Sequence, residues 1–528
     1  MEISGKSLLG FRDAASATAL FHASNPANGA KLDGVFHSAS GADVDLAARL
    51  ASAAFPAFSQ LPSARRAAFL RRIATQMEAL AEPIIERAHL ETALPKARLQ
   101  SETGRTCNQL RLFATVLEEG SWVGARIDRA DPRRKPLPKP DLRSMWHALG
   151  PVAVFGASNF PLAFSVAGGD TASALAAGNP VIVKAHPAHP GTSELVGRVI
   201  RDCVLQEDLP EGTFSLLFDA GNDVGTALVQ HPLVKAGGFT GSTTGGRALM
   251  NLAASRPDPI PFYAEMGSTN PVFLLPGALA ARSKDIASQL QASFTLGSGQ
   301  FCTKPGMIFL PAGAPEVFLS EFRDKVLRSP AFAMLTSGIR ASYQQAIERR
   351  AKRQDTRAVA QGDRAAASGF TAAAAVFETD VPTLQANPEL ADEVFGPSTL
   401  LVTFAGKEQV LQAARELSGH LTATIHGTEE DLQEYAELIE ILRNKVGRIV
   451  FNGYPTGVEV CHSMVHGGPY PASSDGRSTS VGTAAIFRFA RPVCYQDCPD
   501  RLLPDALKNE NSLGIWRLVD GQFTREQL

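Results

Sequence analysis

Apolar positions in the first quarter of the chain recur at the spacing of an α-helix. Stretches rich in alanine, leucine and arginine, such as Leu61–Leu80 and Arg105–Leu117, place their apolar residues three and four positions apart. We therefore expect amphipathic helices over about residues 42–118. Four prolines follow within residues 131–140. Because proline fixes φ and removes a backbone donor, we expect an extended connection there.

A different pattern begins at Pro151, where short apolar runs alternate with helical stretches. Strands are expected at Val152–Phe155, Val181–Val183, Phe214–Phe218 and Ala236–Phe239, and helices at Pro161–Ala177, Ser193–Leu205 and Val224–Gln230. Short, uniformly apolar strands that alternate with helices predict a parallel, doubly wound sheet. This is the architecture of a dinucleotide-binding lobe.

A second alternating set begins after Pro271 with Val272–Leu275 and continues past residues 398–402. The tail from Ser480 onward, Val481–Phe489 and then Arg491-Pro492, is expected to return as a strand and to pair elsewhere, with the Pro-rich segment as the candidate partner. The alanine-rich Ala365–Ala375 is expected to form a loop or a weak helix. The predicted fold class is α/β, with two doubly wound lobes and a small bridging β element.

The expected domain boundaries follow from these changes of pattern. A cofactor-binding domain would comprise residues 1–130 and 145–270, and a catalytic domain residues 271–470. Residues 131–144 and 480–500 would form a bridging and oligomerisation element, and residues 501–528 a C-terminal tail. A chain of 528 residues is too long for one core, which supports such a division.

Composition and charge narrow the classes of protein to which the chain can belong. A hydrophobic fraction of 44% and a formal net charge of -2 are ordinary for a globular enzyme and give no reason to expect nucleic acid as a partner. No stretch approaches the ~20 apolar residues of a membrane span, so no membrane partner is expected. The six cysteines are scattered, and Cys494 and Cys498 complete no familiar zinc spacing. We expect a cytoplasmic setting and no metal site.

Seven short motifs follow one another in an order and at spacings that together are specific. They are Ser158-Asn159-Phe160-Pro161, Val183-Lys184, Phe239-Thr240-Gly241-Ser242, Ala264-Glu265-Met266-Gly267, Gly299-Gln300-Phe301-Cys302, Glu393-Val394-Phe395-Gly396-Pro397 and Phe451-Asn452. Each is weak alone, but together they resemble the aldehyde dehydrogenase superfamily over nearly the whole chain. The resemblance implies an aldehyde dehydrogenase-like fold and NAD(P)-dependent oxidation of an aldehyde to a carboxylic acid.

Cys302 is the expected nucleophile. Hydride can leave an aldehyde carbon for a nicotinamide once that carbon is tetrahedral, and a thiolate supplies the adduct and is left as a thioester that water hydrolyses. By the resemblance, Glu265 is the general base, helped by a raised pKa, and Asn159 donates to the oxyanion together with the Cys302 backbone N–H. Outside this context they would be a buried structural cysteine, a solvated glutamate and a turn-forming asparagine.

The cofactor residues are expected at the carboxyl edge of the first sheet. The turn at Gly241 and Ser242 leads into a helix N-terminus, whose free N–H groups and dipole favour pyrophosphate. By the resemblance, Lys184 holds the adenosine ribose, and Glu393 holds the nicotinamide ribose with Phe395 packed nearby. Ser158 is also assigned to the cofactor. The alternatives are a surface lysine for Lys184 and an exposed helix-end acid for Glu393.

One departure from the family pattern bears on the choice of cofactor. NAD-specific members often carry a glutamate three residues after the lysine, but Pro187 stands there in this chain. Without that carboxylate a 2′-phosphate meets no repulsion, and Lys184 can bind it with help from His186 or His189. We therefore expect NADP and NAD both to be accepted, with NADP slightly favoured.

Longer segments resemble the α-ketoglutarate semialdehyde (2,5-dioxopentanoate) dehydrogenases and the related NADP-linked long-chain aldehyde enzymes. They are residues 102–113, 189–195, 263–271, 466–477 and 491–497. A substrate with its own carboxylate needs a fixed cation, for which Arg105 is the candidate. The alternative is an exposed arginine paired with Glu102. The expected tunnel residues are Phe160, Phe301, Ala163 and Ala167, although the two alanines equally suit close packing.

Three other functions stay open at this point. A medium- or long-chain fatty aldehyde dehydrogenase would need no arginine in the tunnel. A CoA-acylating enzyme is disfavoured because Glu265 would hydrolyse its thioester. A catalytically silent relative is disfavoured because Cys302, Glu265 and Asn159 are all present. The Pro-rich extension and the tail resemble the family's bridging strands, so a homodimer or homotetramer is expected.

Overall fold

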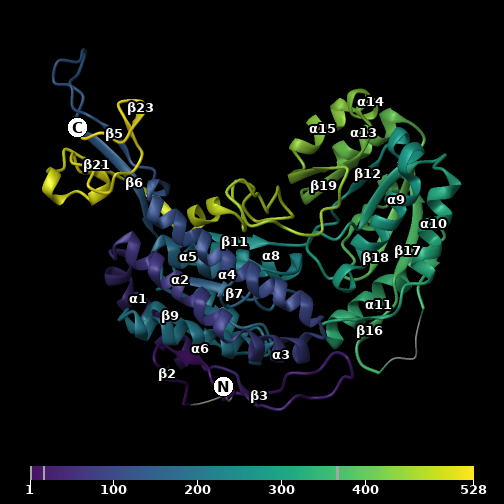
Figure 1. Ribbon diagram of the computed structural model, residues 1–528, viewed down its shortest axis with the longest axis horizontal. Helices are drawn as coiled ribbons and strands as arrows, with labels where there is room; N and C mark the ends of the chain where they lie inside the picture. Colours follow the sequence, from purple (N-terminus) through teal and green to yellow (C-terminus); the bar gives the residue numbers. More distant parts are fainter. Residues whose placement is uncertain (1–2, 16–17, 364–367) are drawn as a thin grey trace.

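Two seven-stranded sheets with their helices form the two lobes of the protein, and a third sheet of five strands extends from the first lobe (Figure 1). The computed structural model describes residues 3–15, 18–363 and 368–528. Both lobes carry parallel strands connected through helices. The predicted class, α/β with two lobes and a bridging β element, is confirmed.

Four helices precede the first parallel strand, as the apolar spacing predicts. They are α1 (Gly41–Ser59), α2 (Ser63–Ala79), α3 (Ala81–Thr92) and α4 (Lys96–Glu119). Helix α1 begins with a capping box, in which the Ser40 hydroxyl accepts from the Asp43 N–H and the Asp43 carboxylate accepts from the Ser40 N–H. Helix α4 ends at Gly120, whose φ of 80° is the left-handed conformation that stops a helix.

The first sheet has the order β11-β10-β7-β8-β9-β1-β2. Its strands are β1 (Leu8–Leu9), β2 (Arg12–Asp13), β7 (Val152–Phe155), β8 (Val181–Lys184), β9 (Phe214–Leu217), β10 (Ala236–Thr240) and β11 (Phe262–Glu265). Its helices are α5 (Gly169–Ala177), α6 (Pro190–Gln206), α7 (Asp223–Gln230) and α8 (Thr243–Ala254). The five strands from β7 to β11 are parallel, and their carboxyl ends therefore meet at one edge.

The helix predicted from Pro161 is shorter than expected and begins at Gly169. Residues between them form turns instead, because the Phe164 carbonyl accepts from the Ala157 N–H and so does not serve residue 168. The adjacent Gly168 and Gly169 also disfavour helix. The result is an irregular loop directly after β7, at the carboxyl edge of the sheet.

The second sheet has the order β15-β17-β18-β13-β12-β19-β20. Its strands are β12 (Val272–Leu274), β13 (Met307–Pro311), β15 (Arg357–Gln361), β17 (Ala375–Asp380), β18 (Ser398–Phe404), β19 (His420–His426) and β20 (Val446–Phe451). Its helices are α9 (Pro276–Thr295), α10 (Glu316–Leu327), α11 (Ser337–Ala351), α12 (Val381–Ala386), α13 (Lys407–Glu416), α14 (Glu429–Glu434) and α15 (Ala436–Arg443). Strand β15 is antiparallel to β17, and the other pairs are parallel.

Short elements complete the two lobes. Strand β3 (Leu20–Phe21) pairs with β4 (Phe36–His37), and β14 (Phe332–Ala333) pairs with β16 (Thr371–Ala372). The 3-10 turns are η1 (Ser121–Val123), η2 (Glu211–Thr213), η3 (Leu296–Gly299), η4 (Pro388–Ala391), η5 (Thr483–Phe489), η6 (Asp500–Leu502) and η7 (Asp505–Leu507). In the alanine-rich stretch 365–375, residues 365–367 lie outside the described part. The remainder holds β16 and the first residue of β17 and no helix.

The third sheet has the order β21-β6-β5-β22-β23. Its strands are β5 (Arg126–Asp128), β6 (Leu142–Ala148), β21 (Ala490–Gln496), β22 (Arg517–Val519) and β23 (Gln522–Thr524). The predicted returning strand exists but begins later than expected: Thr483–Phe489 is a 3-10 turn, and the strand starts at Ala490 and contains Arg491 and Pro492. Its partner is β6 and not the Pro-rich segment, because prolines cannot donate to a ladder. The residues expected to be a tail supply β22 and β23.

None of the described helices is both long enough and apolar enough to cross a membrane.

Candidate active site

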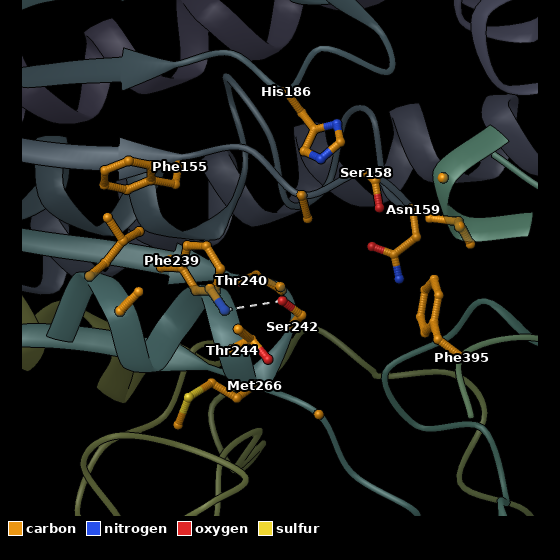
Figure 2. A pocket seen from close by; sticks show the side chains of 18 of the residues that line it. Phe155, Ser158, Asn159, His186, Phe239, Thr240, Ser242, Thr244, Met266 and Phe395 are labelled. Carbon is orange, nitrogen blue, oxygen red and sulfur yellow. Dashed lines mark hydrogen bonds between the residues drawn. The ribbon is translucent and has the colours of Figure 1, made fainter. Parts of the chain in front are cut away.

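A cavity of about 890 Å³ lies at the carboxyl ends of the first sheet and is closed by residues of the second lobe (Figure 2). Phe155, Lys184, Thr240 and Glu265, the last residues of β7, β8, β10 and β11, line it. From the second lobe, α11 and the loop with Glu393 to Phe395 contribute the facing wall. This is the edge at which a doubly wound sheet binds its ligand.

The N-terminus of α8 opens into this cavity. Ser242 is its N-cap, and the Ser242 hydroxyl accepts from the Gly245 N–H at 3.1 Å. A Cβ placed on Gly241 would lie 2.6 Å from the Phe239 ring, so the turn has room for glycine alone. The first N–H groups of α8 and the positive end of its dipole therefore face a tight backbone cradle, which fits the pyrophosphate of a dinucleotide.

Lys184 and His186 lie along the same wall with Ser158. The Lys184 Nζ donates to the Asp219 carbonyl at 3.0 Å, and burial lowers the pKa of Lys184 to about 8. His186 accepts from the Ala188 N–H, and burial, reinforced by His189, lowers its pKa well below the ordinary value. His186 can therefore offer a hydrogen bond but no positive charge at neutral pH.

His189, proposed above as an alternative assistant, is turned away from the cavity. It is fully buried, and its ring bonds the Ala157 carbonyl at 2.7 Å and the Ser193 hydroxyl at 3.3 Å. It holds the loop after β7 against the start of α6. A direct role for His189 in binding a 2′-phosphate is therefore wrong.

Glu393 and Phe395 reach the cavity from the second lobe. Burial raises the pKa of Glu393 to about 7, although the neighbouring Lys304 acts to lower it. The Lys304 ammonium is itself fully buried and donates to the carbonyls of Val394 and Ser398, each at 2.9 Å. The loop that carries Glu393 is thus anchored two residues from Cys302.

Cys302 follows a tight turn at the end of η3. Gly297, Ser298 and Gly299 have φ values of 57°, 62° and 64°, and a Cβ on Gly299 would lie 2.3 Å from the Gly396 carbonyl oxygen. Three successive left-handed residues place the cysteine at the lobe boundary. The buried Asn270 side chain fixes the loop, because its Nδ2 donates to the Cys302 carbonyl at 2.8 Å and to the Lys304 carbonyl at 3.0 Å.

Asn159 lies in the loop after β7 and lines the same cavity as Cys302. Its side-chain Nδ2 donates to the Gln300 carbonyl at 2.9 Å, so the amide is held against the nucleophile loop. The carboxylate of Glu102, on α4, shapes the following turn by accepting from the N–H groups of Leu162 and Ala163 at 2.9 and 3.0 Å. Asn159 is placed where its second N–H can serve an oxyanion.

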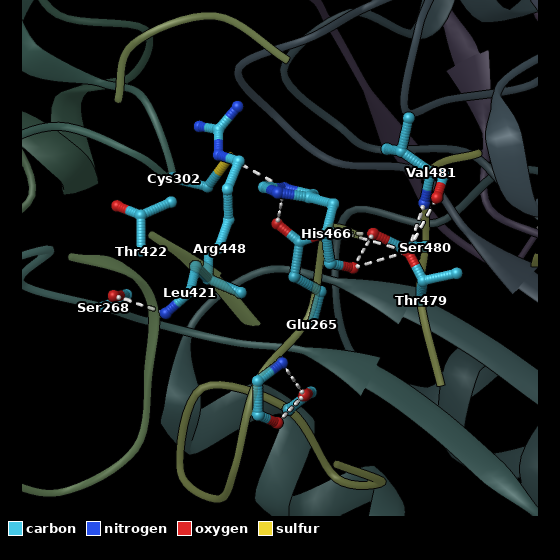
Figure 3. A network of polar contacts seen from close by, with 12 residues as sticks. Glu265, Ser268, Cys302, Leu421, Thr422, Arg448, His466, Thr479, Ser480 and Val481 are labelled. Carbon is cyan, nitrogen blue, oxygen red and sulfur yellow. Dashed lines mark hydrogen bonds and ion pairs between the residues drawn. The ribbon is translucent and has the colours of Figure 1, made fainter. Parts of the chain in front are cut away.

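Cys302 and Glu265 meet at a third residue, His466, which the sequence did not single out (Figure 3). The His466 Nε2 lies 2.9 Å from a Glu265 carboxylate oxygen and 3.5 Å from the Cys302 Sγ. The other Glu265 oxygen accepts from the Ser480 hydroxyl at 2.6 Å. The sequence pointed to His466 only as the first residue of the segment 466–477, which resembles the semialdehyde dehydrogenases. The spacing along the chain did not indicate that this segment contacts Glu265.

The pKa values of Glu265 and Cys302 are both shifted, and the shift of Glu265 is opposite to the one expected. Burial acts to raise the pKa of Glu265, but the charge of His466 and the hydrogen bonds from His466, Ser480 and Cys302 outweigh it, and the net pKa is lowered. The predicted raised pKa is therefore wrong. The pKa of Cys302 is raised well above its ordinary value by burial and then by the Glu265 charge, against which Arg105 acts. The resting pair is a thiol beside a carboxylate.

Arg105 comes from α4 and faces this group of residues. Its guanidinium lies 5.1 Å from the Phe164 ring centre and its Nε donates to the Val458 carbonyl. Burial lowers the pKa of Arg105, against which the charge of Glu102 acts first, followed by those of Cys302 and Glu265. Both terminal nitrogens are buried and have no hydrogen-bond partner among the described residues, and neither bonds Glu102.

The remaining expected tunnel residues divide into two groups. Phe160 and Phe301 pack edge to face, 5.2 Å between ring centres, with the Arg98 guanidinium over both. Ala163 and Ala167 are 0% and 2% exposed, which is what close packing requires. The structure brings the two aromatic rings together, one of them on the nucleophile loop, and buries the two alanines in the first lobe.

Comparison with known proteins identifies relatives along the entire chain. The chain is 50% identical to the alpha-ketoglutaric semialdehyde dehydrogenase 2 of Azospirillum brasilense over 525 residues, 99% of this chain and 100% of that protein. It is 48% identical to the alpha-ketoglutaric semialdehyde dehydrogenase of Acinetobacter baylyi over 493 residues, 93% of each.

Solved structures agree on the fold. An aldehyde dehydrogenase from Bacillus cereus in complex with NAD+ has a TM-score of 0.80 and 20% identity, covering 93% of this chain and 96% of that one. The gamma-glutamyl-gamma-aminobutyraldehyde dehydrogenase of Burkholderia cenocepacia has a TM-score of 0.80 and 21% identity, covering 94% and 97%. The pattern of the aldehyde dehydrogenase family, whose enzymes use NAD or NADP, matches residues 11–489. The chain belongs to the aldehyde dehydrogenase family.

Proposed function

We propose that the chain oxidises α-ketoglutarate semialdehyde to α-ketoglutarate, with Cys302 as nucleophile. Glu265 takes the thiol proton, and the sulfur bonds to the aldehyde carbon while the Asn159 amide and the Cys302 N–H hold the oxyanion. NAD(P), held by the N-terminus of α8, Lys184 and Glu393, would supply the hydride acceptor that this oxidation requires. Loss of hydride from the adduct leaves a thioester on Cys302. Glu265 then releases the thiol proton to solvent. Water adds to the thioester while Glu265 takes a proton from that water, and the carbon–sulfur bond breaks to release the acid and a thiolate, which Glu265 reprotonates.

The observation that carries the substrate assignment is the pair of unsatisfied nitrogens on Arg105. A buried guanidinium with two free N–H edges is costly unless an anion completes its hydrogen bonds. A planar fork of donors suits a carboxylate, to which it can make two parallel bonds. The names of the two near-full-length relatives support the same substrate, since both act on α-ketoglutaric semialdehyde.

The test compares substrates and variants. We expect kcat/KM for 2,5-dioxopentanoate to exceed that for hexanal by tenfold or more, about 1.4 kcal/mol of transition-state preference. Arg105→Ala should lower kcat/KM for the dioxo-acid by about 10- to 100-fold, because hydrogen bonds between charged groups are lost, and should spare hexanal. Arg111→Ala is the matched control, since Arg111 lies on the same helix, exposed and paired with Glu78.

Two results would overturn the substrate assignment. If hexanal is the better substrate, the protein is a fatty aldehyde dehydrogenase and Arg105 has no carboxylate to bind. If Arg105→Ala weakens turnover of both aldehydes equally, the arginine serves the structure of the site. Loss of all turnover in Cys302→Ser tests the nucleophile separately from the substrate.

We propose further that NADP is accepted and slightly favoured over NAD. Pro187 places no carboxylate opposite the adenosine ribose, and the Lys184 ammonium lies at the cavity wall. His186 can add a hydrogen bond. The ratio of kcat/KM for the two cofactors measures the preference, and a strong preference for NAD would contradict it.

We also propose a homodimer or homotetramer formed through the third sheet. This sheet extends away from the lobes (Figure 1) and exposes large apolar side chains, among them Leu137 at 69%, Leu502 at 62% and Phe523 at 75%. Light scattering coupled to size exclusion measures the assembly, and a monomer would contradict the proposal. All six cysteines lie in the described part and are unpaired, which supports a reducing cytoplasmic setting.

A further inference from the structure

His466 places a single ring nitrogen between the two groups that exchange a proton in the proposed reaction. Its Nε2 lies 2.9 Å from the Glu265 Oε1 and 3.5 Å from the Cys302 Sγ (Figure 3). The reacting atoms of all three side chains lie within 4.8 Å of one another. The other ring nitrogen, Nδ1, is buried and has no hydrogen-bond partner in the part of the chain that the structure describes.

These contacts determine where the proton of His466 lies. An ionised carboxylate accepts hydrogen bonds and donates none, so a separation of 2.9 Å between Nε2 and Oε1 requires a proton on Nε2. The ring proton that faces the carboxylate is therefore the one on Nε2, and the Nδ1 side of the ring contacts no polar group among the described residues.

Hydrogen bonds fix the backbone of His466 at both its N–H and its carbonyl. The His466 N–H donates to the Thr479 hydroxyl at 2.8 Å, and the His466 carbonyl accepts from the Ser480 N–H at 2.8 Å. The Ser480 hydroxyl bonds the second Glu265 oxygen, so the carboxylate and the histidine share one support. The Phe164 ring lies 6.1 Å from the imidazole centre. A change of partner at Nε2 then needs little movement of the protein.

We propose that His466 is a hydrogen-bond donor whose Nε2–H follows the negative charge from Glu265 to Cys302 when the thiol is activated. The S–H bond breaks and an O–H bond forms on Glu265, so the sulfur gains the charge that the carboxylate loses. The Nε2–H then donates to the sulfur, which lies at a normal N–H···S distance, and His466 itself neither gains nor loses a proton. This inference rests on the proposed nucleophilic role of Cys302.

The same geometry explains how a thiol with a raised pKa becomes reactive in this site. Burial and the negative charges of Glu265 and Glu393 oppose a thiolate, and Arg105 favours one. Arg448, on β20, also couples electrostatically to Cys302. Both guanidinium groups act through space, whereas the His466 Nε2 lies 3.5 Å from the sulfur. A hydrogen bond donated to an anion is roughly twice as strong as one between neutral groups.

The test separates donation from titration by two substitutions. In His466→Gln the amide N–H can replace Nε2–H but cannot titrate, and in His466→Leu no donor remains. We would measure alkylation of Cys302 by iodoacetamide between pH 6 and pH 10, subtracting the other five cysteines with Cys302→Ser. At pH 7, we expect His466→Leu to slow alkylation by about 10- to 100-fold, the loss of one charged hydrogen bond, and His466→Gln to remain within about threefold.

Two outcomes would overturn the inference. Equal slowing in the glutamine and leucine variants would mean that a titrating imidazole is required, and an unchanged rate in the leucine variant would mean that His466 does not support the thiolate. Dissociation constants for NADP and unfolding midpoints, measured on both variants, identify a merely structural effect, which would weaken both together. Turnover that survives in Cys302→Ser would refute the proposed function instead.

Discussion

Asn270 offers a sharp test of how the nucleophile loop is held. Its side-chain Nδ2 donates to the carbonyls of Cys302 and Lys304, its Oδ1 accepts from the Thr422 hydroxyl at 3.0 Å, and its φ is +47°. Asn270→Ala leaves two buried carbonyls without donors, at about 1–3 kcal/mol each, and forces alanine into the left-handed region at about 1–2 kcal/mol. The sum is about 3–8 kcal/mol, shared between stability and the geometry of the site.

A matched variant separates these two effects. Asn511 is also buried, with φ +49°, and its Nδ2 donates to the carbonyls of Ile515 and Arg525, but it lies in the C-terminal segment, remote from Cys302 in sequence. We expect Asn270→Ala and Asn511→Ala to lower the urea midpoint similarly. Asn270→Ala alone should lower kcat, by tenfold or more, with the KM for the aldehyde changed much less.

A third variant isolates the backbone strain. Asn270→Gly adopts the positive φ freely and should be less destabilised than Asn270→Ala by about 1–2 kcal/mol, yet it should lose kcat as severely because the amide is gone in both. Urea unfolding and steady-state kinetics on the three variants provide the comparison. If Asn270→Gly keeps the kcat of the unsubstituted protein, the amide does not position Cys302, and the reasoning fails.

Two further predictions concern the cofactor. Burial lowers the pKa of Lys184 to about 8, so its positive charge is present below pH 8 and is lost as the pH rises through that value. We therefore expect the affinity for NADP relative to NAD to fall about tenfold between pH 7 and pH 9. Fluorescence titration with both cofactors measures this ratio, and a constant ratio would contradict the prediction. Gly267→Ala would place a Cβ 2.4 Å from the Glu393 Oε2, and we expect a higher KM for NADP with the KM for aldehyde little changed; an unchanged cofactor KM would mean that Glu393 can move aside.

The predictions from sequence succeeded where a local pattern determines a local structure. Val181–Val183 with Lys184 at its end is a buried parallel strand, and the Gly241–Ser242 turn opens a helix, because both depend on short-range apolar spacing and turn chemistry. The position of these side chains at one sheet edge follows from parallel pairing.

The predictions that failed concern features that depend on contacts between distant parts of the chain. The acidity of Glu265 is set by His466 and Ser480, which are 201 and 215 residues away, and no local pattern reports such partners. The imidazole of His189 is a side chain that can bind phosphate, yet its hydrogen bond to the Ala157 carbonyl holds the ring in the protein interior, away from the cavity. The strand predicted at Val481–Phe489 was displaced because its apolar residues pack into the first core as a 3-10 turn.

The segment from His466 to Ser480 has a consequence for the order in which the protein matures on the ribosome. Strand β11 can form early, but Glu265 acquires its bridge to Ser473 and its partners His466 and Ser480 only when the last part of the chain has emerged. Strand β5 waits still longer for β22 at residues 517–519. A chain can therefore possess both lobes and still lack a completed catalytic carboxylate, so the site becomes reactive only after residues 466–480 have packed against β11.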